Sequence, residues 1–358
     1  MHKQKLILLY NWHCQEKHWI PEELRKRQYE IKIIDVRETQ ELNRGGRLFR
    51  GKNLLRSFQL AKEAIEFTSN KDIIISMTST PGICCALLLL LPQYRNKKVG
   101  VLALNTLAHW GSDHALMECI RDKFYATAFQ YRHLWTTVNI ANDISLYQNK
   151  MNIPQDKIIW LPDAIENLNQ AESKTIDDGY IFSGGMSERD WRAVVYCASN
   201  MPNEEFVIVA NKKYWLEDNP QLDNLKVYFD IPQKKFNELL NGSKLVLLTV
   251  RKNGVAGLMV LFQALRSDKI FIATDTEALR IFVAPGVSEE VLYPSGKNKV
   301  LLSKLEHILK LNKNETEEKI QILSKYIYEN YSEEKYLDRL EKIIKTMKET
   351  TNEYSNDC

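Results

Sequence analysis

A strand-like run near the middle of the chain ends in glycines and polar side chains that could bind a phosphate group. Residues 181–191 have the sequence IFSGGMSERDW. Gly184 and Gly185 allow a ligand to approach the backbone closely, the N–H groups at the start of the following helix attract anions, and Arg189 supplies a cation. Asp190 is suited to cap that helix. The segment predicts a phosphate site, and an ordinary Gly-Gly turn is the alternative interpretation.

A second loop with glycines follows another strand-like run. Residues 249–275 (TVRKNGVAGLMVLFQALRSDKIFIATD) have the pattern strand, loop, helix, turn and strand. Gly254 and Gly257 place a second helix N-terminus at the same edge of the predicted sheet, so the two termini could share a diphosphate. Gln263 is the notable polar residue inside the apolar helix, and amphipathicity alone would place it on an exposed stripe.

Strands and helices must position these loops, and the chain supplies both in alternation. Short apolar runs separated by helical stretches occupy residues 5–10, 30–36, 72–77, 98–104, 134–139 and 157–161, and then 179–182, 206–210, 225–229, 244–249 and 270–274. Such runs are typical of parallel strands that are buried on both faces. The sequence therefore predicts an α/β protein with two doubly wound, Rossmann-like domains that face each other across a cleft.

The domain boundaries follow from length and polarity. A chain of 358 residues exceeds what one hydrophobic core usually holds. The stretch 166–178 (ENLNQAESKTIDD) is polar and predicts a linker. We therefore expect an N-terminal domain (1–165), this linker, a C-terminal domain (179–315), C-terminal helices (316–349) and a tail (350–358).

Composition limits the class of protein. Hydrophobic residues make up 44% and charged residues 27%, as in soluble globular proteins. The apolar run at 83–91 is far shorter than the roughly 20 residues that span a bilayer, and no secretory signal is evident. We expect a cytoplasmic protein. Residues 1–165 hold 23 Lys+Arg and 16 Asp+Glu, which favours an anionic surface or substrate on that side, or an ordinary solvated surface.

Three motifs of the second half resemble the donor-binding domain of group 1 (family 4-like) glycosyltransferases with the GT-B fold. They are GGxSxRDW at 184–191, FVIVANK at 206–212 and AGLxVLxQALxxxKxxIATD at 256–275. In the first half, KIIWLPDA (157–164) and HWIPEELRKRQYEIKIIDV (18–36) are similar to the family's strands and first helix. The resemblance implies sugar transfer from a nucleotide-sugar donor, with UDP as the expected nucleotide. No metal ligand set or CxxC pair is present, so no metal or other cofactor is expected.

The resemblance also implies roles for particular residues of the second half. Gly184, Gly185 and Arg189 would contact the nucleotide diphosphate, with Arg189 as the main cation that stabilises the leaving group. Gly257 and the amides after it would lie beside the donor sugar or phosphate. Lys212 and Arg251, on adjacent strand ends, would be further donor-binding cations.

Two positions depart from the family's paired-glutamate signature. Gln263 falls where many of these enzymes carry a glutamate that binds the ribose, and an amide can still hydrogen-bond hydroxyl groups. Val255 occupies the position of the first glutamate.

In the first half, the resemblance places the acceptor side and a catalytic histidine after strand ends. His109 is the candidate for that histidine, with Asn105 as the alternative, and Trp110 follows it. The alternative is a structural role, which a histidine beside a tryptophan has more often. Trp12 and His13 follow the first strand and could line an acceptor pocket, since sugars bind to flat apolar faces and directional polar groups.

One basic segment could contact an anionic membrane or a lipid-diphosphate acceptor. Cations alternate there with Leu48, Phe49 and Leu54, and each cation near such a surface contributes about 1 kcal/mol. A solvated loop is the alternative. Nucleic-acid binding is not expected, because the pI is about 8.3 and no recognition motif is present. The cations are Arg44, Arg47, Arg50, Lys52 and Arg56.

The sequence thus predicts a metal-independent, retaining glycosyltransferase that acts on a carbohydrate or lipid-linked acceptor, in surface polysaccharide or glycoconjugate synthesis. It would work in the cytoplasm, with contact to the inner face of the membrane as a further hypothesis. Two alternatives stay open. One is a catalytically silent GT-B partner protein, which Val255 and Gln263 favour, and the other is an enzyme similar to nucleotide-sugar 2-epimerases.

Overall fold

The structure is a computed structural model. It describes residues 3–353 except 13, 15–17, 37–46, 106–114, 167–178, 186–187, 217, 219–220 and 252–255, and it describes only the backbone of residues 47–51, 115–118 and 352–353. The described chain forms two compact units. Unit 1 comprises Met1–Asp163 and Tyr336–Cys358, and unit 2 comprises Ala164–Lys335.

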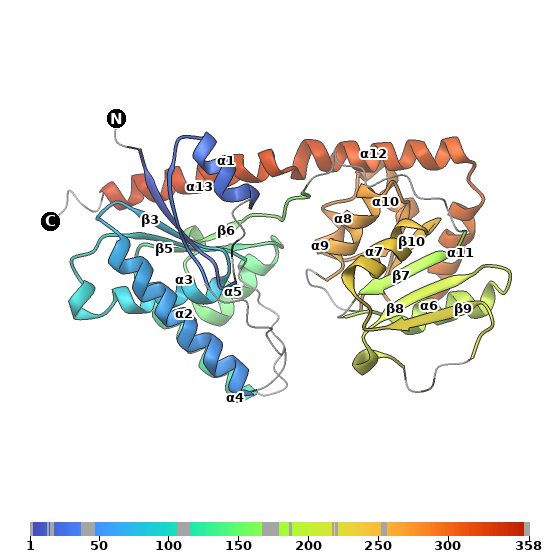
Figure 1. Ribbon diagram of the computed structural model, residues 1–358, viewed down its shortest axis with the longest axis horizontal. Helices are drawn as coiled ribbons and strands as arrows, with labels where there is room; N and C mark the ends of the chain where they lie inside the picture. The colour runs from blue at the N-terminus through green and yellow to red at the C-terminus, as the bar shows by residue number, and fades with distance from the viewer. Residues whose placement is uncertain are drawn as a thin grey trace. The chain divides into compact units, whose positions relative to one another are not determined.

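Unit 1 is built on a six-stranded parallel sheet with the order β2-β1-β3-β4-β5-β6. Helices α2 to α5 cover one face of this sheet, and α1 and α13 cover the other (Figure 1). Its strands are β1 (Lys5–Leu9), β2 (Glu30–Ile34), β3 (Ile73–Ser76), β4 (Gly100–Ala103), β5 (Leu134–Val138) and β6 (Ile158–Trp160). Its helices are α1 (Trp19–Lys26), α2 (Arg47–Phe67), α3 (Ser79–Leu89), α4 (Ala115–Ala128), α5 (Asp143–Met151) and most of α13 (Glu333–Glu353), with short turns η1 (Pro92–Tyr94) and η2 (Gln155–Lys157).

Unit 2 is built on a second six-stranded parallel sheet, with the order β12-β11-β10-β7-β8-β9. Helices α6 and α11 lie on one face and α7, α8 and α10 on the other, with α12 packed outside α8 and α10 (Figure 1). The strands are β7 (Ile181–Gly185), β8 (Phe206–Ala210), β9 (Leu225–Phe229), β10 (Leu245–Leu248), β11 (Phe271–Thr274) and β12 (Leu292–Tyr293). The helices are α6 (Trp191–Asn200), α7 (Gln233–Asn241), α8 (Leu258–Arg266), α9 (Glu277–Arg280), α10 (Pro285–Val291), α11 (Asn298–Leu309) and α12 (Lys313–Tyr331), with the turn η3 (Lys212–Tyr214).

Burial explains why these runs form strands. The central strands β1, β3, β4, β7, β8 and β10 are almost wholly buried, because helices cover both faces of each sheet. The edge strand β9 alternates half-buried and exposed residues instead. Each sheet reverses its strand order once, between β1 and β3 in unit 1 and between β7 and β10 in unit 2. Open α/β sheets bind ligands at the carboxyl ends of the strands beside such a switch point.

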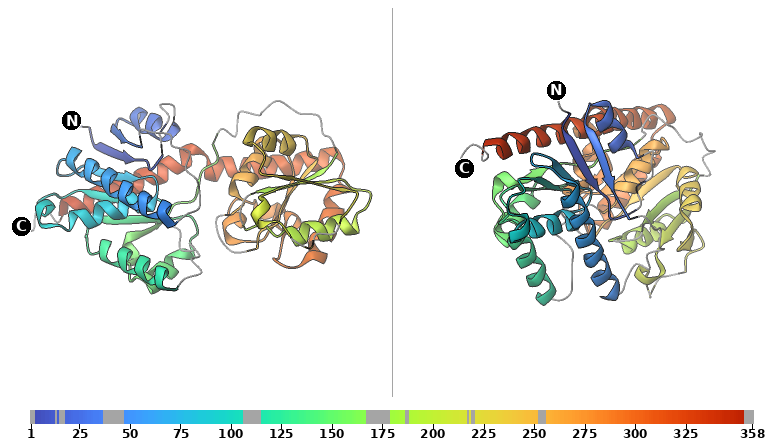
Figure 2. Two further views of the ribbon diagram at one scale, coloured as in Figure 1. Left: turned by 60° about the horizontal axis from the view of Figure 1, so that its bottom comes forward. Right: turned by 60° about the vertical axis from the view of Figure 1, so that its left-hand side comes forward.

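The carboxyl-terminal helix α13 belongs to unit 1. Its buried residues Leu337, Leu340, Ile344 and Met347 recur at helical spacing. Ion pairs also join this helix to unit 1: Arg27, directly after α1, donates to Asp338 and Glu341 of α13, both at 2.8 Å. Both views in Figure 2 show the red terminal helix against the sheet of unit 1. The C-terminal helices expected at 316–349 are thus divided between the units, with α12 in unit 2.

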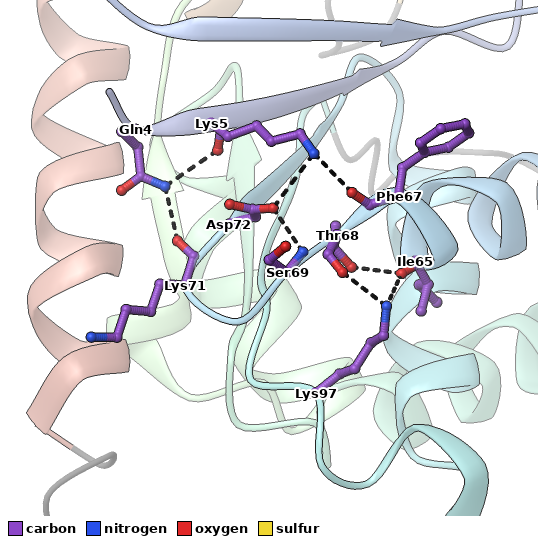
Figure 3. Close-up of polar contacts among 9 residues, drawn as sticks. All are labelled: Gln4, Lys5, Ile65, Phe67, Thr68, Ser69, Lys71, Asp72 and Lys97. Carbon is purple, nitrogen blue, oxygen red and sulfur yellow. Dashed lines mark hydrogen bonds and ion pairs between the residues drawn. The ribbon is translucent and has the colours of Figure 1, made fainter. Parts of the chain in front are cut away.

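Lysine side chains hold the amino-terminal edge of the sheet in unit 1 (Figure 3). Lys97 Nζ donates to the carbonyl oxygens of Ile65 and of Thr68, the latter at 2.9 Å, and Lys5 Nζ donates to Phe67 O at 2.9 Å. These carbonyls lie in the last turn of α2 and directly after it, so the ammonium groups cap the helix and oppose its dipole. Asp72 completes the cluster by accepting from Ser69 N at 2.8 Å.

The predicted fold class is confirmed: the protein is α/β, with two doubly wound Rossmann-like units. Each strand-like run identified in the sequence forms a strand, and the structure adds β12, which is too short for a periodicity argument. The expected linker 166–178 lies outside the described residues except for Glu166. Helix α13 continues to Glu353, into the segment expected to be a tail. Among the described residues, no helix is both long and apolar enough to cross a membrane.

Candidate functional site

The switch point of unit 2 brings the glycine-rich loop after β7 against the end of β10. Arg189 forms an antiparallel bridge with Val250, and Asp190 N donates to Thr249 O at 3.0 Å. Arg251 N donates to Glu188 O at 2.9 Å. These backbone bonds fix the loop on two neighbouring strands and so position its side chains.

Two glycines end β7 because no larger residue fits. A Cβ atom on Gly184 would lie 2.6 Å from the ring of Phe236 and 2.7 Å from that of Phe182. Gly185 has φ +141°, which other residues rarely adopt, and a Cβ there would lie 2.3 Å from the guanidinium of Arg189. The Gly-Gly pair therefore makes room for the arginine and is more than a simple turn.

Arg189 is a buried cation at the carboxyl edge of the sheet. It is 7% exposed, and its Nε donates to Gly184 O at 2.9 Å. Burial lowers the pKa of Arg189 to about 10, so the guanidinium still carries its charge at neutral pH. A desolvated positive charge interacts strongly with an anion that reaches it.

Further polar groups surround this edge. Lys212 follows β8 and Arg251 follows β10, the two strands that flank β7, and both residues are exposed. Gly257 has φ +99° and is the N-cap residue of α8, the helix that follows β10. Thr249 Oγ1 is buried and has no hydrogen-bond partner within the described part of the chain. The structure thus groups Gly184, Gly185, Arg189, Lys212, Arg251 and Gly257 at one edge of one sheet.

Gln263 lies away from this group. It is 7% exposed, and its Nε2 lies 3.4 Å from Asn241 Oδ1 and 3.3 Å from Ser267 Oγ. Arg266 donates to its Oε1 at 2.9 Å. Asn241 precedes β10 and Ser267 precedes β11, so these contacts belong to the amino-terminal edge of the sheet. Gln263 is also not on an exposed stripe, since α8 is buried at almost every position.

An aromatic cluster beside Lys212 was not predicted from the sequence. Trp215 lies 5.7 Å from Trp191 and 5.9 Å from Phe229, measured between ring centroids. Phe229 is 38% exposed and Tyr214 is 55% exposed. The signal in the sequence is the pair KKYW (212–215) and VYF (227–229), which follow or end two adjacent strands. Half-exposed rings at a strand edge can stack on a planar ligand group.

The carboxyl edge of the sheet in unit 1 holds the remaining candidates. Trp12 is 39% exposed and packs edge-on against Tyr10 at 5.2 Å. Asn105 follows β4 with φ +54°, and its N–H donates to Thr137 Oγ1 at 3.0 Å. His13, His109 and Trp110 lie outside the described residues.

A buried carboxyl group lies at the same edge. Asn139 follows β5, and its Nδ2 donates to Asp163 Oδ2 at 2.8 Å. Burial raises the pKa of Asp163 to about 6, against the opposing effect of the Asn139 amide. Asn11, Thr78 and Asn139 at this edge were not predicted as site residues from the sequence, although each is a polar residue shortly after an apolar strand.

The basic segment is only partly described. Lys52 is exposed and Arg56 half-buried on α2, and Leu55 beside them is 67% exposed. Arg44 and the side chains of Arg47 and Arg50 lie outside the described part. Within the described residues, no group of three or more His, Cys, Asp or Glu side chains could hold a metal ion.

The two sheets with their switch points define the class of fold: two Rossmann-like domains of the GT-B type. No protein-family model matches the sequence, and no curated protein matches it in sequence. Solved structures do match along nearly the whole chain. A glycosyltransferase from Rickettsia africae is 10% identical, with a TM-score of 0.61 over 97% of this chain and 99% of that one.

The names of two further matches contain trehalose 6-phosphate. A synthase from Burkholderia multivorans is 11% identical, with a TM-score of 0.69 over 99% of both chains. An Escherichia coli structure bound with UDP-2-fluoro glucose is 10% identical, with a TM-score of 0.67 over 96% of this chain and 99% of that one. At such low identity the likeness establishes the fold that this chain shares with glycosyltransferases.

Proposed function

We propose that this protein is a glycosyltransferase that transfers a sugar from a nucleotide-sugar donor, with UDP as the nucleotide. The observation that carries the proposal is the buried guanidinium of Arg189 at the switch point of unit 2, beside the two glycines that make room for it and an α8 N-terminus. This combination suits a diphosphate, which needs cations and N–H donors. The fold, which solved glycosyltransferases share, supports the same function.

In the proposed reaction, the bond between the anomeric carbon of the donor sugar and the diphosphate oxygen breaks. The diphosphate leaves with the electron pair, and the acceptor oxygen forms the new bond to the anomeric carbon. The acceptor hydroxyl proton passes to the departing diphosphate. The resemblance to group 1 enzymes favours retention of configuration. Arg189 would stabilise the charge that develops on the leaving group, and Lys212 and Arg251 would add to this field.

The aromatic cluster of Trp215 and Phe229 would support the nucleotide base. Stacking on an aromatic side chain is worth about 1–3 kcal/mol per base. Phe229→Ala should therefore weaken nucleotide binding by roughly 5- to 150-fold. Tyr228→Ala changes the preceding ring on β9, which points to the opposite side of the strand, and should leave binding unchanged.

Calorimetric titration with UDP-, GDP-, dTDP- and CMP-sugars tests the donor site directly. We expect selective binding of UDP-sugars. Arg189→Met, which keeps most of the side-chain volume, should weaken that binding by roughly 10- to 150-fold, since a hydrogen bond to a charged group is worth about 1.5–3 kcal/mol. Arg192→Met removes an exposed arginine from the next turn and is the matched control. Unchanged affinity in a folded Arg189→Met protein would contradict the assignment.

Turnover separates an enzyme from a silent partner protein. The position of Gln263 at the opposite edge of the sheet is the observation that favours the silent alternative, because it leaves the expected ribose contact unmade. Slow release of UDP from a bound UDP-sugar without acceptor would identify an enzyme. Tight binding with no release, with or without an acceptor, would identify a binding partner.

The exposed end of α2 would contact an anionic membrane or a lipid-linked acceptor, which fits a role in surface polysaccharide or glycoconjugate synthesis on the cytoplasmic side. Lys52 and Arg56 would meet the charge, and Leu55 would insert among the lipids. Sedimentation with phosphatidylglycerol vesicles should retain the protein, and Leu55→Asp with Lys52→Glu should release it. Equal sedimentation with phosphatidylcholine vesicles would argue against the electrostatic contact.

A further inference from the structure

Gln263 is not placed to bind the ribose of a nucleotide at the carboxyl edge of unit 2. Its side chain contacts Asn241 and Ser267 at the amino-terminal edge of the sheet, whereas Arg189 and the aromatic cluster lie at the opposite edge. Ribose hydroxyl groups are hydrogen-bond donors, and an ionised carboxyl group accepts with both of its oxygens. A carboxylate at the carboxyl edge is therefore suited to make the ribose contact.

The order of the strands indicates where such a carboxylate should lie. With β7 counted as the first strand, the sheet of unit 2 has the order 3-2-1-4-5-6, as in dinucleotide-binding Rossmann domains. In those domains the diphosphate lies at the glycine-rich turn after the first strand, and an acidic residue about 20 residues further along the chain binds the ribose. In unit 2, the second strand β8 is followed directly by Asn211 and Lys212. The acidic residue has to come from elsewhere at this edge.

Asp230 supplies a carboxyl group from the neighbouring strand. It directly follows β9, whose last residue Phe229 is the partner of Ala210 at the end of β8. Asp230 N donates to Ala210 O at 3.2 Å, and Lys212 N donates to Asp230 Oδ2 at 3.4 Å. These two bonds turn the carboxylate from β9 towards the end of β8, which lies beside β7 and its glycine-rich loop.

The backbone of Asp230 has a conformation that favours glycine. Its φ is +50°, which aspartate tolerates because its short side chain can bond to the nearby backbone. Asp230 is exposed, and its Oδ1 accepts no hydrogen bond from any other described residue. One oxygen therefore orients the carboxylate, and the other can accept from a ligand hydroxyl group.

Other carboxyl groups near this edge have partners or face another strand. Asp190 caps α6 by accepting from a backbone N–H, and Asp218 and Asp275 each form an ion pair with an arginine. The backbone of Glu188 is bonded to Arg251 after β10, on the side of β7 away from the aromatic cluster. Asp230 differs from these four, because its carboxylate lies beside the aromatic cluster and has no cationic side chain as a partner among the described residues.

From this placement we infer that Asp230 binds the ribose hydroxyl groups of the donor nucleotide and so selects ribonucleotide donors over deoxyribonucleotide donors. The inference rests on the proposed function, because it concerns the same donor site. The base would stack on Phe229, and the diphosphate would lie at Arg189, two strands or roughly 10 Å away. The ribose joins the base to the diphosphate, so it would pass over the end of β8, towards which Asp230 is turned.

Deoxynucleotides test the inference on the full-length protein. Calorimetric titration would compare UDP with 2′-deoxy-UDP and 3′-deoxy-UDP, which keep the base and the diphosphate. UDP should bind about tenfold more tightly than at least one of the two, because that ligand lacks a hydrogen bond to a charged group. Equal affinity for all three nucleotides would overturn the inference.

Removing the carboxylate separates a ligand contact from a structural role. Glycine suits the φ of +50°, so Asp230→Gly should leave the melting temperature almost unchanged. Its affinity for UDP should fall about tenfold, and its affinity for the weaker-binding deoxynucleotide should stay the same. Asp230→Asn keeps the shape of the side chain without the charge and should show a smaller loss of the same kind.

Asp268→Gly is the matched control. Asp268 is also an exposed aspartate with a left-handed backbone, at φ +52°, but it lies between α8 and β11 at the amino-terminal edge of the same sheet. This substitution should leave the affinities for UDP and for both deoxynucleotides unchanged. A loss of UDP affinity equal to that of Asp230→Gly would show that the effect does not come from a contact at the carboxyl edge.

The outcomes distinguish the inference from the proposed function. If UDP binds and Asp230→Gly weakens UDP and both deoxynucleotides equally, the carboxylate acts on the loop and not on the ribose. The inference then fails while the donor site stands, as it does if Asp230→Gly binds UDP as tightly as the unaltered protein. If UDP does not bind to the unaltered protein, the proposed function fails and the inference fails with it.

Discussion

Arg189 Nε donates a hydrogen bond of 2.9 Å to the carbonyl oxygen of Gly184, five residues earlier in the chain. This bond folds the arginine over Gly185, where any Cβ atom would overlap the guanidinium. One short segment therefore places a buried positive charge at the centre of the edge where ligands bind in such sheets.

Replacing Gly185 should disturb both stability and the candidate site. Gly185→Ala puts a methyl group 2.3 Å from the guanidinium at φ +141°, so the free energy of unfolding should fall by roughly 2–4 kcal/mol. Urea denaturation measures this, and UDP titration should show weaker binding because Arg189 is displaced. Gly286→Ala, where nothing lies within 4 Å, should change stability little. A fully stable Gly185→Ala protein would show that Arg189 is not held in place.

The buried carboxyl group of Asp163 should make stability depend on pH. Its pKa is about 6 in the folded protein against 3.8 in the unfolded chain, so the folded state binds the proton more tightly. The stabilisation from this proton is complete below pH 3.8 and is lost as the pH rises through 6. Asp163→Asn should therefore raise the free energy of unfolding at pH 7.5 by roughly 1–3 kcal/mol and add little at pH 4. A gain of equal size at both pH values would contradict the raised pKa.

Protonation of His133 should change the free energy of unfolding in the opposite direction over a similar pH range. Burial, together with Arg132, Lys157 and Lys98, lowers its pKa from 6.5 to about 4. The unfolded chain then binds the proton more tightly, so stability is lost as the pH falls from 6.5 to 4. His133→Phe should remove up to about 3 kcal/mol of this acid sensitivity, measured by urea denaturation at pH 7 and pH 4.5. If both proteins lose equal stability at pH 4.5, the histidine is protonated in the folded state.

Lys97 should contribute to stability through the end of α2. Lys97→Met keeps the apolar stem but removes the ammonium group that caps the carbonyls of Ile65 and Thr68, so the free energy of unfolding should fall by about 1–2 kcal/mol. Lys71→Met is the matched control, because the ammonium of Lys71 points away from the cluster in Figure 3. Thermal or urea unfolding of both variants gives the comparison, and an equal effect of the two would show that capping is not the cause.

Local patterns in the sequence determined the elements of this protein. Apolar runs such as 206–210 and 245–248 form buried strands because both faces of each sheet are covered. A strand that is buried on both faces needs apolar residues at every position, so the run can be identified from the sequence. The GGxSxRDW segment likewise predicted a loop between a strand and a helix. Its arginine could be named from the sequence because a cation after two glycines is a local signal.

Only the tertiary structure determines which of these elements and side chains are neighbours. Gln263 was expected near the nucleotide, but its contacts with Asn241 and Ser267 are fixed by how α7 and α8 pack, and no local pattern encodes that packing. The assignment of α13 to unit 1 depends on Arg27, more than 300 residues away in the chain. The group of polar residues at the carboxyl edge of the sheet in unit 1 likewise depends on strand order. Asn11, Thr78 and Asn105 become neighbours because β1, β3 and β4 pair in register, and register is a property of hydrogen bonds between distant segments.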